Sequence, residues 1–239
     1  MKYIVAGAPR SGTSMMMACL SAGGIKPYYD KEKEKELANH HPETNKSGFF
    51  ERHTDEIESF NFPANAPDES AIKFLKPWTR LPTLRPDRYR IIIMKRDPRE
   101  ILHSLATLND GIITTGDIAL LNLYPMYINR AIEHAKNRKD MISVHVCDYR
   151  TFLGDPHAFF FKLKQHYWPL HINDAARVVN LDSVKSPLYE FPFSGDVAKD
   201  MQLPNPKSAK DAILDGTLGA SEEVINAAKE GFELDLVAQ

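Results

Sequence analysis

Cysteine is scarce in this sequence, and its scarcity excludes two kinds of protein. Only Cys19 and Cys147 occur among the 239 residues. Two cysteines so far apart cannot form a disulfide framework or a cysteine-rich metal site. Both lie in apolar stretches, MMMACLSAG and ISVHVCDY, so we expect reduced thiols in the core.

A strong net charge and a long apolar run are also missing. The formal net charge of -2 argues against a nucleic-acid partner, because such binding needs a broad basic surface. The apolar start YIVAGA runs directly into Pro9 and Arg10, so neither a signal peptide nor a membrane span is visible. We therefore expect a cytoplasmic protein. The composition, with 43% hydrophobic and 26% charged residues, is that of an ordinary globular protein, and single α/β domains often reach this length, so we expect a single domain over residues 1–239.

Histidine offers no convincing metal site in this sequence. His40 and His41 are adjacent in a polar, charged stretch over residues 28–48, without a third ligand nearby. Such pairs are far more often surface residues, so we expect no metal. The Lys/Glu alternation of the same stretch is typical of an exposed helix or a mobile segment.

Apolar runs alternate with helical patterns along most of the chain. Four runs read as strands, KYIVAGA, SAIKFLKP, RYRIIIMKRDP and DMISVHVCDY, and each is followed by a segment of helical periodicity or a proline. This alternation predicts an α/β fold, a three-layer sandwich with a mostly parallel central sheet, in which ligands bind at the carboxyl ends of the strands. Residues 180–239 are proline-rich and less periodic, and we interpret them as a C-terminal wrap or lid of unassigned role.

The loop GAPRSGTS after the first strand is similar to a phosphate-binding loop. Gly7 permits a tight turn, Gly12 lets main-chain N–H groups approach an anion, and a helix N-terminus follows. The lysine of that loop is missing, because Thr13 stands in its place. Arg10 supplies a planar, permanently charged group instead. The pattern predicts a fold like that of the P-loop NTPases and an anionic ligand, and the missing lysine argues against ordinary ATP hydrolysis, although the glycines could serve turn geometry alone.

A second motif, KRDPREILHSL, could bind another anion. Arg96 ends a predicted strand, and Ser104 follows eight residues later on a predicted helix. The turn at Asp97 and Pro98 can bring the two side chains together around a second phosphate. Either residue alone would more often be an ordinary surface group.

Together these motifs resemble those of the sulfotransferases that use 3'-phosphoadenosine 5'-phosphosulfate. APRSGTSMM is similar to the 5'-phosphosulfate loop of that family, and IIIMKRDPREILHSL is similar to its 3'-phosphate segment. VHVCDYRTFLGDP is a weaker match to a later strand of the family, so the resemblance covers about residues 1–165. It implies transfer of a sulfuryl group to a hydroxyl or amine of a small-molecule or glycan acceptor, without a metal.

Carried over to this sequence, the resemblance implies roles for individual residues. The 5'-phosphosulfate would contact Arg10, Ser11, Gly12, Thr13 and Ser14. The 3'-phosphate would contact Arg96 and Ser104, and Tyr149 would lie either near the adenine or in the core. Arg10 would also stabilise charge on the leaving nucleotide.

The catalytic base is where the sequence departs from one large branch of the family. That branch has a histidine after the second strand, whereas this chain has KFLKP. The segment KSGFFERH resembles the Gly-Phe/Tyr-Phe-Glu stretch of bacterial-type members, which makes Glu51 the first candidate for the base and His53 the second. Lys73 or Lys76 could neutralise the transferring group.

Two other functions compete with this interpretation. A small P-loop kinase is disfavoured by the missing lysine and by the lack of a magnesium-binding aspartate after an apolar strand. A nucleotide-binding protein that has the fold without catalysis is the other alternative, and the departure at the histidine position supports it.

Overall fold

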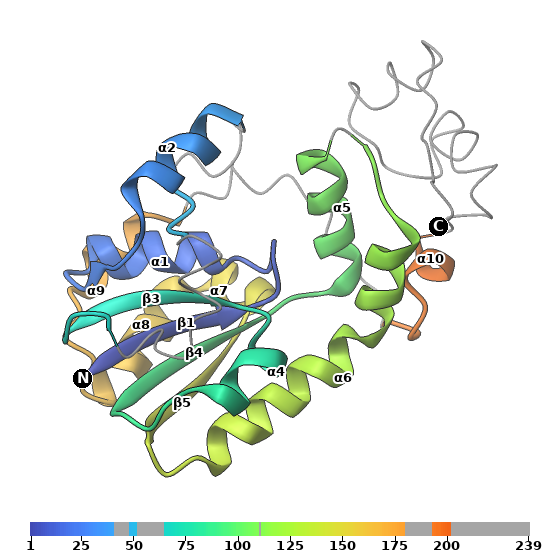
Figure 1. The fold of residues 1–239 in the computed structure, drawn as a ribbon. Helices are drawn as coiled ribbons and strands as arrows, with labels where there is room; N and C mark the ends of the chain where they lie inside the picture. The colour runs from blue at the N-terminus through green and yellow to red at the C-terminus, as the bar shows by residue number, and fades with distance from the viewer. Residues whose placement is uncertain (41–47, 52–64, 110, 180–192, 202–239) are drawn as a thin grey trace. The chain divides into compact units, whose positions relative to one another are not determined.

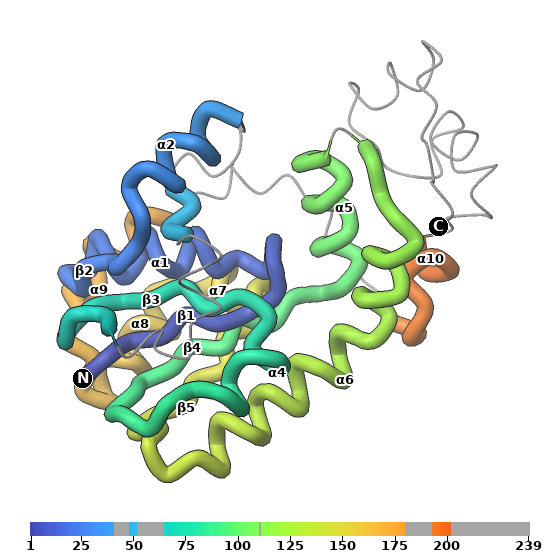
Figure 2. Tube along the Cα trace, viewed as in Figure 1, coloured from blue at the N-terminus to red at the C-terminus, as the bar shows by residue number. Residues whose placement is uncertain are grey.

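A computed structural model describes residues 1–40, 48–51, 65–109, 111–179 and 193–201 of the chain. The described residues form two compact units. Unit 1 takes in Met1–Arg96 and Tyr127–Val184, and unit 2 takes in Asp97–Met126 and Lys185–Gln239. The path of the chain through both is traced in Figure 2.

Unit 1 is built on a five-stranded sheet in which every neighbouring pair is parallel (Figure 1). The spatial order is β2-β3-β1-β4-β5, so β1 lies at the centre. The strands are β1 (Lys2–Gly7), β2 (Lys26–Pro27), β3 (Ser70–Leu75), β4 (Tyr89–Lys95) and β5 (Met141–Asp148). All six residues of β1 are buried, as expected for a strand covered on both faces.

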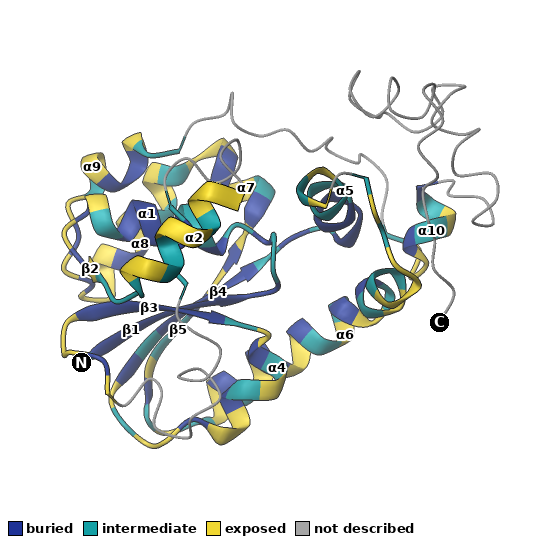
Figure 3. Cartoon of the chain, turned by 45° about the horizontal axis from the view of Figure 1, so that its top comes forward, coloured by how far each residue is buried: buried dark blue, intermediate teal, exposed yellow. Residues whose placement is uncertain are grey.

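Helices cover both faces of this sheet, which gives the unit three layers (Figure 3). On one face lie α1 (Thr13–Ala22), α7 (Tyr149–Gly154), α8 (Pro156–Gln165) and α9 (Ile172–Arg177). On the other lie α4 (Pro77–Arg80), the 3-10 turn η1 (Leu81–Thr83) and the part of α6 (Thr115–Asn137) that begins at Tyr127. Helix α2 (Lys31–His40) has no buried residue, in keeping with its charged sequence.

Alternation along the strands divides the apolar core between the two faces. Val5, Ile92 and Met94 belong to the core cluster that includes the buried side of α1. Their strand neighbours, such as Ile4 and Ile93, are also fully buried and point to the other face. The two-sided burial explains why the strands contain long runs of apolar residues.

Unit 2 contains α5 (Pro98–Leu108), the start of α6 and the short helix α10 (Val197–Asp200). Asp97 caps α5 by accepting a hydrogen bond from the N–H of Arg99, and its carboxylate also binds the Arg99 guanidinium at 2.6 Å. Arg99 is nearly fully buried and lies 3.6 Å from Asp200 of α10. A buried arginine between two carboxylates ties α10 to the start of α5.

The predicted fold class is confirmed, since the sheet is parallel and lies between two layers of helices. The four predicted strands correspond to β1, β3, β4 and β5. The edge strand β2 was not predicted, because two residues carry no periodicity. Cys19 and Cys147 are buried free thiols. Across the described parts of the chain, no helix is long and apolar enough to cross a membrane.

Candidate functional site

The candidate site lies at the carboxyl ends of β1, β3 and β4, the three central strands of the sheet (Figure 1). The chain leaves β1 to form β3 on one side and later returns to form β4 on the other. In parallel α/β sheets, ligands bind where the strand order reverses in this way. The loop after β1, the residues at the end of β3 and Arg96 after β4 therefore meet at the expected position.

The loop after β1 is a tight turn with internal hydrogen bonds. The N–H of Ser11 donates to the carbonyl of Ala8 at 3.2 Å, and the Ser11 hydroxyl donates to the same oxygen at 2.7 Å. Arg10 and Gly12 both have left-handed backbones, with φ of 65° and 95°. A left-handed conformation is costly for arginine but easy for glycine, so the loop holds Arg10 in a strained state.

The N-terminus of α1 follows directly and has no side-chain cap. Gly12 occupies the N-cap position without a capping hydrogen bond, and the first turn contains no acidic residue. The first N–H groups of a helix have no partner within the helix, and the helix dipole adds partial positive charge there. This end of α1 is consequently suited to bind an anion.

Arg96 and Tyr149 hold the loop from the side of β4 and β5. One guanidinium nitrogen of Arg96 donates to the carbonyl of Arg10 at 2.7 Å. The guanidinium carbon lies 4.0 Å from the centre of the Tyr149 ring, within cation–π range. The same ring is so close to Gly12 that a Cβ there would meet its Cδ2 at 2.7 Å. Arg96 and Tyr149 thus hold the two left-handed residues of the turn, Arg10 and Gly12.

Lys73 of β3 makes the other half of the site. Its ammonium donates to the Ser14 hydroxyl at 3.0 Å, the Phe49 carbonyl at 2.8 Å and the Glu51 carboxylate at 2.9 Å. An ammonium has three N–H donors, so these acceptors use all of them. The Lys73 side chain is 5% exposed and that of Glu51 is 29% exposed, which leaves the carboxylate as the outward member of the pair.

The site has more positive than negative charge. Among the described residues, Arg10, Arg96 and Lys73 carry three positive charges, and the nearby carboxylates of Glu51 and Glu34 offset only part of them. Burial lowers the pKa of the Arg10 guanidinium, and the charge of Arg96 lowers it further, while Tyr149 and Glu51 oppose the change. Burial likewise lowers the pKa of the Lys73 ammonium, against the attraction of Glu51. An anionic ligand would relieve both effects.

The structure brings most of the predicted site residues together. Arg10, Ser14, Glu51 and Arg96 are linked through the contacts above, whereas Ser11 and Thr13 are buried within the turn. Ser104 lies on α5 in unit 2, and its pairing with Arg96 stays a prediction. His53 lies outside the described residues. Among those that are described, no group of three His, Cys, Asp or Glu side chains could hold a metal ion.

Two contacts of the site were missed in the sequence. Glu34 of α2 binds the backbone N–H groups of Phe49 and Phe50, although its charged surroundings indicated only a solvated helix. The packing of Tyr149 on Gly12 was also missed. Neither contact has a sequence signal, because each joins residues that no local motif relates.

Comparison with known proteins gives only distant structural similarity. No family model matches the chain, and no curated protein matches it. A structure of retinol dehydratase in complex with androsterone and inactive cofactor PAP is 14% identical, with a TM-score of 0.43, covering 92% of this chain and 81% of that one. A complex of retinol dehydratase with retinol and PAP is 16% identical, with a TM-score of 0.34, covering 91% of this chain and 67% of that one. Neither similarity bears on the roles of individual residues here.

Proposed function

We propose that this protein is a sulfotransferase that moves a sulfuryl group from 3'-phosphoadenosine 5'-phosphosulfate to a hydroxyl or amine of a small-molecule or glycan acceptor. The observation that carries the proposal is the uncapped N-terminus of α1, preceded by Arg10, in a loop that has Thr13 in place of the phosphate-loop lysine. A sulfuryl group carries less charge than a terminal phosphate, and its transfer needs no magnesium in the sulfotransferases that the sequence motifs resemble. Arginine and the helix N–H groups are then sufficient to stabilise the charge that develops during the transfer.

The donor would be held by its anionic groups. The main-chain N–H groups at the start of α1, with Arg10, would bind the 5'-phosphosulfate, and the Ser14 hydroxyl would join them by turning its proton away from the Phe49 carbonyl. Arg96, whose guanidinium donates to the Arg10 carbonyl, would bind the 3'-phosphate. The excess positive charge of the site fits such a ligand, which carries several negative charges.

Glu51 would act as the base on the acceptor. Its carboxylate is the outward member of the pair with Lys73, and one oxygen is held by that ammonium at 2.9 Å. The acceptor proton would pass to Glu51 as the acceptor oxygen or nitrogen attacks sulfur and the bond from sulfur to the bridging oxygen breaks. Arg10 and the N-terminus of α1 would stabilise the charge that builds on the leaving phosphate.

A thermal-shift comparison tests the donor first. 3'-Phosphoadenosine 5'-phosphate should raise the melting temperature more than adenosine 5'-monophosphate or ATP with magnesium, because only the first carries a 3'-phosphate. In Arg96→Ala, the advantage over adenosine 5'-monophosphate should disappear. An equal loss of thermal shift for both nucleotides in Arg96→Ala would show that Arg96 acts on the loop alone. A thermal shift of the wild type by ATP with magnesium as large as that by 3'-phosphoadenosine 5'-phosphate would reject the sulfotransferase function.

A transfer assay tests the chemistry. A donor with a radiolabelled sulfuryl group would be incubated with a panel of small-molecule and glycan acceptors. Glu51→Gln should lower transfer by about 100-fold or more while retaining the thermal shift, since loss of a general base has an effect of that order. Transfer by Glu51→Gln at the wild-type rate would rule out Glu51 as the base.

A further inference from the structure

The segment that carries Glu51 has an unusual backbone. Gly48 and Phe50 both have left-handed conformations, with φ of 108° and 56°. Phenylalanine rarely adopts this conformation unless its surroundings impose it. The position of Glu51 therefore depends on whatever holds residues 48–51.

Helix α2 holds this segment through one carboxylate. The two oxygens of Glu34 accept hydrogen bonds from the N–H groups of Phe49 at 2.6 Å and Phe50 at 2.7 Å. Just before the helix, the N–H of Asp30 donates to the carbonyl of Glu51 at 2.9 Å. A side chain at Gly48 would meet Glu34 Oε1 at 3.0 Å, so the glycine leaves room for this contact.

The opposite side of the same segment contacts the loop site. The carbonyl of Phe49 accepts from the Lys73 ammonium at 2.8 Å and from the Ser14 hydroxyl at 3.3 Å. The Phe50 ring packs edge-on against Tyr29, with ring centres 5.5 Å apart. Glu34 and Lys73 thus bind consecutive backbone groups from two sides, and Glu51 follows immediately.

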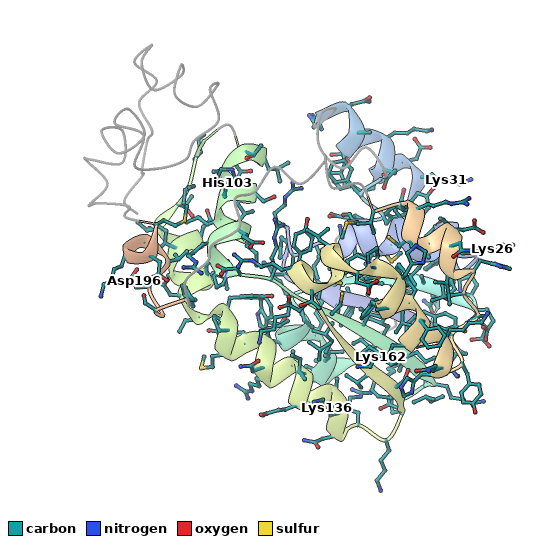
Figure 4. The ribbon with its side chains drawn as sticks, turned by 180° about the vertical axis from the view of Figure 1, so that it is seen from behind. Lys26, Lys31, His103, Lys136, Lys162 and Asp196 are labelled. Carbon is teal, nitrogen blue, oxygen red and sulfur yellow. The ribbon has the colours of Figure 1, made fainter. Side chains whose placement is uncertain are left out.

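We infer that Glu34 is a positioning residue that holds the Glu51 carboxylate at the site through the main chain of Phe49 and Phe50. The inference rests on the proposed function, in which Glu51 is the base. The other acids of α2 do not have this role in the structure, since Glu32 and Glu36 pair with lysines of the same helix. The start of α2, where Figure 4 labels Lys31, is thereby connected to the chemistry of the site.

Kinetics of Glu34 variants test the inference. Glu34→Ala should lower kcat by about tenfold or more and leave the KM for the donor within about twofold, because a small displacement of the base impairs the reaction without altering donor contacts. Glu34→Gln retains one acceptor oxygen, so its kcat should lie between that of Glu34→Ala and that of the wild type. Glu32→Ala removes the same charge from an exposed position of α2 and should behave as wild type.

A double-mutant cycle separates positioning from general destabilisation. In the Glu51→Gln background, Glu34→Ala should have no further effect, since the group that it positions is already absent. Equal effects of Glu34→Ala in both backgrounds would overturn the inference. Wild-type transfer by Glu51→Gln would instead refute the base assignment in the proposed function.

Amide hydrogen exchange tests the physical link without any transfer assay. In Glu34→Ala, the amides of Phe49 and Phe50 should exchange at least about tenfold faster, as expected when a held segment opens locally. The same amides should be unaffected by Glu32→Ala. Unchanged protection in a folded Glu34→Ala protein would show that other contacts hold the segment and would overturn the inference.

Discussion

At the scale of single residues, Gly12 joins the turn to the helix and cannot be replaced easily. Its φ of 95° disfavours any side chain, and the Tyr149 ring occupies the place of a Cβ. The ring is buried and also lies under the Arg96 guanidinium, so it has little freedom to move away. One substitution would therefore disturb the backbone, the ring and the arginine together.

We predict that Gly12→Ala destabilises the protein by about 2 kcal/mol or more, from the left-handed backbone and the clash combined. It should also abolish the thermal shift by 3'-phosphoadenosine 5'-phosphate. Chemical denaturation of both proteins measures the stability change, and thermal unfolding with and without the nucleotide measures the shift. Gly154→Ala is the matched control, because a Cβ at Gly154 meets nothing within 4 Å, and its stability should stay within about 1 kcal/mol of the wild type. Similar stabilities of the two variants would contradict the packing described for Gly12.

At the scale of elements, α8 packs against α7 through aromatic side chains. Phe160 is fully buried and packs edge-on against Phe152 of α7, with ring centres 5.5 Å apart. The next residue, Phe161, is 56% exposed. Consecutive residues on a helix point in directions about 100° apart, which explains this difference between identical side chains.

This contrast gives a prediction with a control in the adjacent position. Phe160→Ala should cost about 3–5 kcal/mol of unfolding free energy, since it removes a buried ring and leaves a cavity. Phe161→Ala should change stability by no more than about 0.5 kcal/mol. Thermal or denaturant unfolding measures both. Equal costs at the two positions would mean that α8 packs with another face.

At the scale of the whole molecule, stability should depend on pH through one buried histidine. His145 of β5 is 6% exposed, and its Nε2 has no hydrogen-bond partner in the described part of the chain. The pKa of His145 is lowered from 6.5 to about 4, first by burial and then by the nearby charges of His166, Lys162 and Arg90. Lys162 is labelled on α8 in Figure 4, and the ring of His166 lies 4.8 Å from that of His145.

The sign of the effect follows from this depressed pKa. Above pH 6.5, His145 is neutral in both the folded and the unfolded protein. Between pH 6.5 and about 4, His145 binds a proton in the unfolded chain but stays neutral in the folded protein. The free energy of unfolding should therefore fall by up to about 3 kcal/mol as the pH decreases through this window. The paired carboxylates of Asp87 and Asp140, with pKa values lowered from 3.8, lose their contribution only at lower pH.

Denaturation of the wild type at several pH values checks this prediction. His145→Gln should flatten the dependence between about pH 6.5 and about pH 4, because glutamine does not titrate. The exposed His157→Gln should retain the wild-type dependence. If His145→Gln followed the wild-type curve, the loss of stability in acid would have another source.

The sequence by itself determined the fold class, the loop after β1 and the placement of Arg10 and Arg96. These features depend on local patterns: two-sided apolar strands, a glycine loop that opens a helix, and an arginine that ends a strand. The order of such elements restricts a parallel sheet to few topologies, so the carboxyl ends of the strands could be expected to meet. The single domain over residues 1–239, the role of Ser104 and the cytoplasmic location stay predictions.

Only the tertiary structure decided how the groups of the site support one another. Lys73 contacts Ser14, 59 residues away, and Glu51, 22 residues away, while Glu34 reaches Phe49 across 15 residues. Contacts over such separations arise from chain packing and leave no periodicity in the sequence. The same holds for Tyr149, whose ring fixes Gly12 and Arg96 because the sheet brings the ends of β1, β4 and β5 side by side.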